Sequence, residues 1–122
     1  MARLFSSGFE INNLTSGVEF KTITGSPTIN STIKRSGSFS MRCNPTSSNA
    51  YASVTFLTTP ASNVYARAYV YIASAPLLNT LIMQFSNAGT LEAGIRLNTD
   101  RTLQGVAKGG DVGSPSSALS LD

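Results

Sequence analysis

The sequence predicts an all-β fold of antiparallel strands, and three observations lead to that prediction. Short runs of alternating apolar and polar residues recur along the 122 residues, with Gly, Pro and Asn between them. Only 12% of the residues are charged, whereas about a quarter are Ser or Thr, which suits strands and turns better than helices. No stretch of helical period is long enough to compete. The length fits one domain over residues 1–122.

Three short alternating runs, 18–24, 38–43 and 52–56, are predicted as strands in the first half of the chain. Gly25-Ser26-Pro27 ends the first run, because this composition is typical of turns and proline cannot donate a ladder hydrogen bond. The spacing of the runs leaves room for short connections between them.

Cys43 is the only cysteine, so no disulfide can form within the chain. It shares the face of an alternating run with Phe39 and Met41. The sequence contains no histidine that could activate the thiol. We therefore predict a small core residue rather than a nucleophile.

The longest and most regular run is Asn63 to Ala73. Its apolar side holds five residues: Val64, Ala66, Ala68, Val70 and Ile72. Its other side holds Tyr65, Arg67, Tyr69 and Tyr71. This length and alternation predict a central strand of a sheet.

The second half continues the strand pattern. A run over Leu77–Ser86 leads to a predicted hairpin turn at 87–89, and a further alternating run covers 90–97. Asn98–Arg101 reads as another turn before a run that begins at residue 102. About seven short strands with turns every 8–12 residues indicate a sandwich or a barrel.

Residues 105–117 are predicted to be a Gly/Ser/Pro-rich loop, because four glycines fall between 105 and 113 and Ser-Pro-Ser-Ser follows them. Residues 118–122 then resemble the approach to another element. We expect the fold to be incomplete at the C-terminus, with its last strand unpaired or supplied to a neighbouring chain.

Four segments together resemble the concanavalin A-like (laminin G-like) jelly-roll domains that are common in bacteriophage structural proteins. They are Gly8-Phe9-Glu10, residues 35–42, the Val64–Ile72 run and residues 117–122. The resemblance covers most of the chain and consists of strand patterns. It implies a two-sheet jelly-roll sandwich with a role on a virion or in glycan binding. It supplies no functional residues.

The sequence offers no catalytic machinery, and we predict that the protein is not an enzyme. No two of its six acidic residues lie at i and i+2, the spacing of paired carboxylates on one strand. The absence of histidine excludes a Ser-His triad and the usual zinc sites. Calcium binding by Asn98, Asp100 and Asp111 remains an alternative, but loop Asp and Asn more often form turns. We therefore predict no metal and no cofactor.

Charge and hydropathy limit the partners. The net charge of +3 is mild, and only Lys34 and Arg35 are adjacent among nine basic residues, so nucleic-acid binding is not expected. No apolar run approaches the ~18 residues of a membrane helix, and we expect no membrane contact. The N-terminus lacks a stretch of signal-peptide length, which predicts a cytoplasmic origin.

The side formed by Tyr65, Arg67, Tyr69 and Tyr71 is the candidate binding surface. One interpretation is an aromatic platform for a partner protein or a sugar, since Tyr and Arg are enriched at binding hot spots. The other is that this side packs beneath the second sheet. The second is favoured, because central sandwich strands are usually covered on at least one face.

Two functions from different classes follow. The first is a structural virion protein, such as a capsid decoration or head-associated protein of a phage, that contacts the major capsid protein, other virion proteins or copies of itself. The second is a lectin-like module that binds a glycan through Tyr65, Tyr69 and Tyr71. The lack of tryptophan, the commonest sugar-stacking residue, counts against the second.

Overall fold

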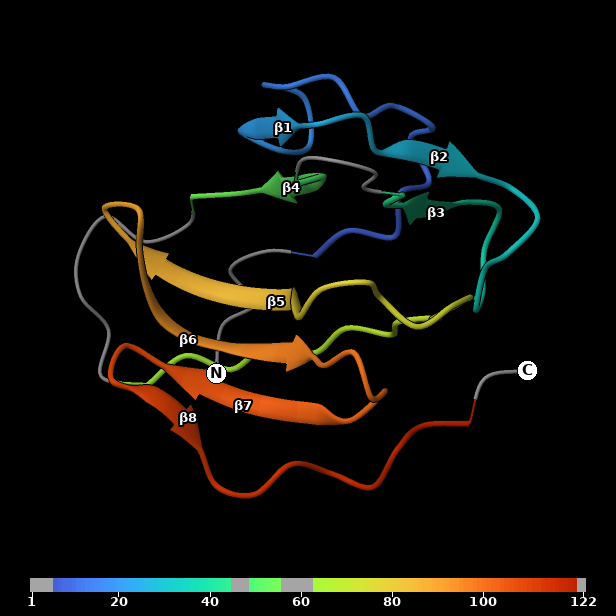
Figure 1. The fold of residues 1–122 in the computed structure, drawn as a ribbon. Helices are drawn as coiled ribbons and strands as arrows, with labels where there is room; N and C mark the ends of the chain where they lie inside the picture. Colours follow the sequence, from blue (N-terminus) through green and yellow to red (C-terminus); the bar gives the residue numbers. More distant parts are fainter. Residues whose placement is uncertain (1–5, 45–48, 56–62, 121–122) are drawn as a thin grey trace. The chain divides into compact units, whose positions relative to one another are not determined.

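The strands of the described residues form antiparallel sheets and no helix occurs among them, so the all-β prediction is confirmed. The computed structural model describes residues 6–44, 49–55 and 63–120. Its strands form two two-stranded sheets and one four-stranded sheet (Figure 1). Antiparallel sheets are consistent with a β-sandwich. The chain divides into two compact units, Met1–Ala66 and Arg67–Asp122, and a single domain over 1–122 stays a prediction.

The first unit contains four strands of three residues each: β1 (Thr22–Thr24), β2 (Thr28–Asn30), β3 (Ser40–Arg42) and β4 (Tyr51–Ser53). β1 pairs with β4, and β2 pairs with β3. β1 and β3 lie inside predicted runs, and β4 overlaps the third run but begins one residue before it. β2 was not predicted. Phe56, at the end of the third run, lies outside the described residues.

Phe20 is the large buried apolar side chain described in the first unit, where Pro27 is buried as well. The Phe20 ring stacks on Phe9, with the ring centroids 5.6 Å apart and the planes 15° from parallel. The first predicted run is shorter in the structure, because residues 17–19 form a turn and the strand begins only at Thr22. Gly17 has a φ of +87°, which glycine adopts without the steric cost of a side chain.

The second unit contains a four-stranded sheet: β5 (Thr80–Asn87), β6 (Thr90–Leu97), β7 (Leu103–Ala107) and β8 (Gly110–Val112). Its strand order is sequential, so each strand pairs with the next along the chain. The predicted hairpin turn is confirmed, because Asn87 pairs with Thr90 across Ala88 and Gly89. The predicted turn after β6 is confirmed as well, and Arg101 N donates to the Asn98 carbonyl there at 3.0 Å.

The prediction that 105–117 is a loop is wrong in part. β7 extends to Ala107, and β8 pairs with it through the partners Gly105–Val112 and Ala107–Gly110. The Lys108-Gly109 turn brings the backbones of β7 and β8 together. Backbone hydrogen bonds form the ladder between them, so this pairing does not require an alternating pattern of side chains. Residues 114–117 lie outside strands, as predicted.

The predicted central strand over Asn63–Ala73 is wrong, because the structure assigns no strand to residues 63–73. Strands β5 to β8 follow one another through short connections and pair locally. The alternating segment has no such tight turn joining it to β5; Ser74, Pro76 and two leucines intervene. Alternation specifies which side chains share a face, and it does not by itself determine whether a segment forms a ladder.

Candidate binding surface

The four residues of the predicted surface are all exposed. Tyr65, Tyr69 and Tyr71 expose 72%, 57% and 58% of their area, and Arg67 is exposed as well. Tyr65 belongs to the first compact unit, which ends at Ala66, whereas Arg67 and the other two tyrosines belong to the second. The interpretation that this side packs beneath a second sheet therefore does not hold for these residues.

Arg67 and Tyr69 contact each other directly. The guanidinium carbon of Arg67 lies over the Tyr69 ring, 5.4 Å from its centroid. A cation at this distance is attracted by the negative face of the ring. The alternation predicts this contact, since residues two apart in an extended segment lie on the same side.

The apolar side of the same segment is also exposed. Val64 and Val70 expose 36% and 50% of their area. The prediction of a central strand required these two side chains to be buried. Apolar exposure continues beyond the segment at Leu77 and Leu78, which expose 94% and 77%. Large apolar side chains that gather in water usually mark an interaction site. The two leucines were not predicted as part of the surface.

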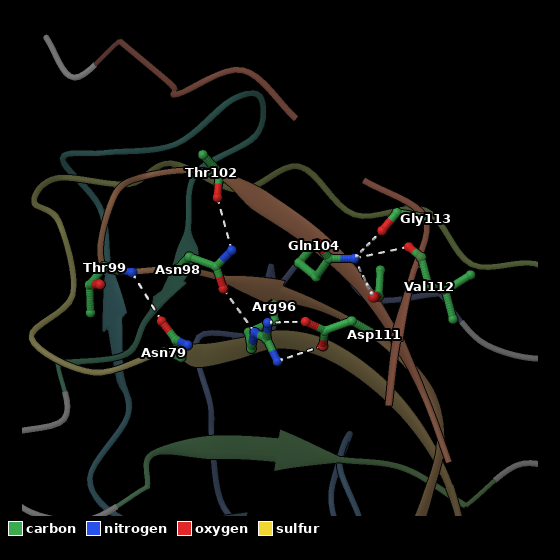
Figure 2. A network of polar contacts seen from close by, with 10 residues as sticks. Asn79, Arg96, Asn98, Thr99, Thr102, Gln104, Asp111, Val112 and Gly113 are labelled. Carbon is green, nitrogen blue, oxygen red and sulfur yellow. Dashed lines mark hydrogen bonds and ion pairs between the residues drawn. The ribbon is translucent and has the colours of Figure 1, made fainter. Parts of the chain in front are cut away.

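A polar network occupies the four-stranded sheet of the second unit (Figure 2). Arg96 on β6 forms a two-pronged ion pair with Asp111 on β8, with both N–O distances at 2.8 Å. Arg96 Nε also donates to Asn98 at 2.8 Å, and the Asn98 amide donates to the Thr102 hydroxyl at 2.8 Å. The network thus ties two strands to the β6–β7 turn.

Asp100 completes this turn. Its carboxylate accepts hydrogen bonds from the Thr102 hydroxyl at 2.8 Å and from the Thr102 backbone N–H at 3.0 Å. These bonds, the side-chain bond first, lower the pKa of Asp100. The carboxylate is fully exposed, so the arrangement is typical of a turn-forming aspartate.

The calcium alternative gains no support from this geometry. Both Asp111 oxygens accept hydrogen bonds from Arg96, and Asp100 accepts from Thr102. The Asn98 oxygen accepts from Arg96. Within residues 6–44, 49–55 and 63–120, no three His, Cys, Asp or Glu side chains gather as a metal site requires.

Gln104 was not predicted as important, yet it is 2% exposed. Its amide nitrogen lies within hydrogen-bond distance of three backbone carbonyls, those of Gly105, Val112 and Gly113, at 2.9–3.2 Å (Figure 2). The β7–β8 ladder ends before Gly113, whose φ is +70°, and farther along the chain Ser116 N–H donates to the Leu103 carbonyl of β7 at 2.9 Å. The Gln104 side chain therefore satisfies carbonyls at the point where the β7–β8 ladder ends.

Glu10 links two segments that carry the family resemblance. Its carboxylate accepts hydrogen bonds from the backbone N–H groups of Ser38, at 2.9 and 3.0 Å, and Phe39, at 3.3 Å. Gly37 has a φ of +73°, and a Cβ at this position would collide with the Glu10 carboxylate. The contact fastens the N-terminal turn to the β2–β3 connection, which is a structural role.

The prediction that Cys43 is a core residue is wrong. Cys43 is exposed, one residue beyond the end of β3. The strand stops at Arg42, so the alternation no longer controls where the next side chain points. Partial burial raises the pKa of its thiol, which disfavours the reactive thiolate.

No family model, curated protein or solved structure matches the chain. In the part of the chain that the structure describes, no helix is long and apolar enough to cross a membrane.

Proposed function

We propose that the chain is a non-enzymatic structural protein of a virion, such as a capsid decoration or head-associated protein of a bacteriophage, that acts through protein–protein contacts. Its partners are the major capsid protein, other virion proteins or further copies of the chain. The proposal includes the two-sheet jelly-roll arrangement that the family resemblance implies. The virion assignment draws on that resemblance, and the contact role draws on the exposed segment around Arg67.

One observation carries the contact role: the exposed tyrosine-rich segment lies in a stretch of very low charge. Arg67 is the only charged residue between Arg42 and Glu92. Protein interfaces are depleted of charge at their centres and enriched in tyrosine and arginine. Tyr65, Tyr69 and Tyr71 are exposed around that arginine. This composition favours a protein partner over a strongly charged ligand.

The test uses virus particles purified from a culture of the host that carries the gene for this chain. Mass spectrometry would count copies of the chain per particle after density-gradient purification. We expect the wild-type chain to be retained and a triple variant, Tyr65→Ala with Tyr69→Ala and Tyr71→Ala, to be reduced by about tenfold or more, as loss of interface tyrosines predicts. Tyr51→Ala is the matched control, because Tyr51 is also exposed but lies on β4.

Two results would overturn the proposal in different ways. Absence of the wild-type chain from the particles would exclude the virion role. Retention of the triple variant at the wild-type level would exclude the tyrosine segment as the contact surface. Far-ultraviolet circular dichroism of each variant checks that the strands still form.

The exposed tyrosines also favour a second candidate, a lectin-like module that binds a glycan. Exposed aromatic faces are what a sugar ring requires for stacking. A glycan array that shows binding by the wild-type chain and loss on Tyr69→Ala, together with absence from particles, would favour this candidate over the first.

A further inference from the structure

β7 is longer than the strand that pairs with its outer edge. β8 has three residues and pairs with β7 from Gly105 to Ala107. Leu103 begins β7 two residues before Gly105, beyond the end of β8. The edge of β7 at Leu103 is therefore not covered by β8.

Residues 114–119, which we call the strap, cover this part of the edge. The Ser116 N–H donates to the Leu103 carbonyl at 2.9 Å, and the Leu119 N–H donates to the Arg101 carbonyl at 3.0 Å. The chain after β8 thus runs back along β7 (Figure 1). The strap and β7 both belong to the second compact unit.

The strap does not continue the register of β8. If it did, Ser114 would lie opposite Leu103, but Ser116 takes this place instead. Gly113 has a φ of +70°, and Pro115 has no backbone N–H for a ladder. The structure accordingly assigns no strand to residues 114–119. Residues 113–115 separate the strap from β8 and serve as its hinge.

The Ser116 hydroxyl takes the place of the backbone carbonyl that a ladder residue would offer. The Leu103 N–H donates to Ser116 Oγ at 2.9 Å, and this hydroxyl donates in turn to the Ser117 carbonyl at 2.7 Å. The Ser116 N–H meanwhile donates to the Leu103 carbonyl. Ser116 therefore pairs both backbone groups of Leu103 and acts as the latch of the strap.

Little of the strap is buried. Residues 114–118 are exposed, and Leu119 is half-buried. Segments with few buried apolar contacts and exposed hydrogen bonds open locally at a low free-energy cost. An open strap uncovers the N–H and the carbonyl of Leu103, and uncovered backbone groups at a sheet edge accept segments from other chains.

We propose that the strap closes the β7 edge through Ser116 and that an open edge accepts the strap of a second copy. The contact within one chain identifies this occupant, since every copy carries the segment that fits the edge. Exchange of an identical element between copies is a low-cost route to dimers. The inference rests on the proposed function and deepens it, because further copies of the chain are one of its partners.

Amide hydrogen exchange of Leu103, followed by NMR in the full chain, tests the latch. We expect Ser116→Ala to speed this exchange about tenfold, because the Leu103 N–H loses its acceptor. Ser117→Ala is the matched control, since Ser117 is exposed beside the latch and contributes its backbone carbonyl to it. Unchanged exchange of the Val106 amide, in the buried part of β7, shows that the sheet stays folded.

A mixture of two chains tests the second copy. An isotope-labelled Ser116→Ala chain is combined with an excess of unlabelled wild-type chain, which supplies straps that carry the latch serine. We expect the wild-type chain to slow Leu103 exchange in the labelled chain by about threefold or more, as binding by mass action predicts. The same excess of unlabelled Ser116→Ala chain is the control and leaves the exchange unchanged.

Equal Leu103 exchange in the wild-type and Ser116→Ala chains would overturn the latch. Faster exchange in Ser116→Ala that the added wild-type chain does not slow would overturn strap exchange between copies. If either result occurs while the chain is still retained on particles, this inference falls and the proposed function stands. If both arms succeed while the chain is absent from particles, strap exchange stands and the virion role falls.

Discussion

Gln104 combines near-complete burial with three backbone carbonyls around one amide nitrogen. Two N–H groups can serve at most two of these carbonyls fully at one time. A buried carbonyl that loses its hydrogen-bond donor still carries the free-energy cost of desolvation, and no hydrogen bond offsets that cost. We therefore infer that Gln104 stabilises the end of the β7–β8 ladder.

Gln104→Met tests this role, since it keeps a long unbranched side chain and removes both donors. We expect the free energy of unfolding to fall by about 1–3 kcal/mol, because the Val112 and Gly113 carbonyls lose their partner. Chemical denaturation would measure the change. Gln84→Met is the matched control, because Gln84 is exposed on β5 of the same sheet. Equal effects of the two substitutions would refute the role.

Asp100 gives a pH-dependent contribution of known sign. The hydrogen bonds from Thr102 lower its pKa in the folded chain, so folding favours the ionised carboxylate. The stabilisation is complete above the pKa of the unfolded chain and is lost as the pH falls through the lower folded pKa. We expect Thr102→Val to raise the pKa of Asp100 towards its ordinary value.

A carboxyl-carbon NMR titration of Asp100 measures this change directly. Thr99→Val serves as the control, because Thr99 is exposed in the same turn and does not supply these hydrogen bonds. An unchanged Asp100 titration in Thr102→Val would show that the hydroxyl is not the main cause of the shift.

The β5–β6 hairpin has a turn that departs from the usual residue preferences. Ala88 and Gly89 have φ values of +47° and +83° in a two-residue turn. Positive φ at both positions is the type I′ pattern, for which Asn-Gly is preferred. Alanine in the left-handed region carries a steric cost that asparagine tolerates better.

We expect Ala88→Asn to raise the free energy of unfolding by about 0.5–1 kcal/mol, because it relieves this cost. Thermal or chemical denaturation would detect the gain. Ala118→Asn is the control, since Ala118 is exposed outside the left-handed region. A loss of stability in Ala88→Asn would contradict the assigned turn.

Local sequence signals predict the elements that pair locally. The 90–97 run became β6 with the same bounds, and Asn87-Ala88-Gly89 formed the expected turn. β8 escaped prediction, because Gly110-Asp111-Val112 has too few side chains to show an alternating pattern. Its ladder depends on the backbone of β7 and on the Lys108-Gly109 turn.

The residues of the candidate surface follow from the alternation alone, and their role in binding stays a prediction. Their exposure could not be predicted, because burial depends on whether other segments pack over the tyrosine side. Gln104 could not be found from the sequence. Its role comes from the carbonyls at Val112 and Gly113, which only the three-dimensional path of the chain brings together.

Among the described residues, the buried apolar side chains are Phe20, Leu97, Val106 and Pro27. Small cores give marginal stability, since burial must offset the conformational entropy of the ordered chain. Association with a partner adds stability that grows with the logarithm of the partner's concentration. The exposed segment around Arg67 is the part of the chain whose composition best suits such an association.

Hydrogen exchange of the chain, free in solution and in purified particles, tests most directly whether the segment around Arg67 is a contact surface. Mass spectrometry of peptides that cover 64–72 and 103–107 would follow both segments in one sample. We predict slower exchange in 64–72 on the particle than in the free chain, with β7 equally protected in both. Equal exchange of 64–72 in the free and the particle-bound chain would contradict this account.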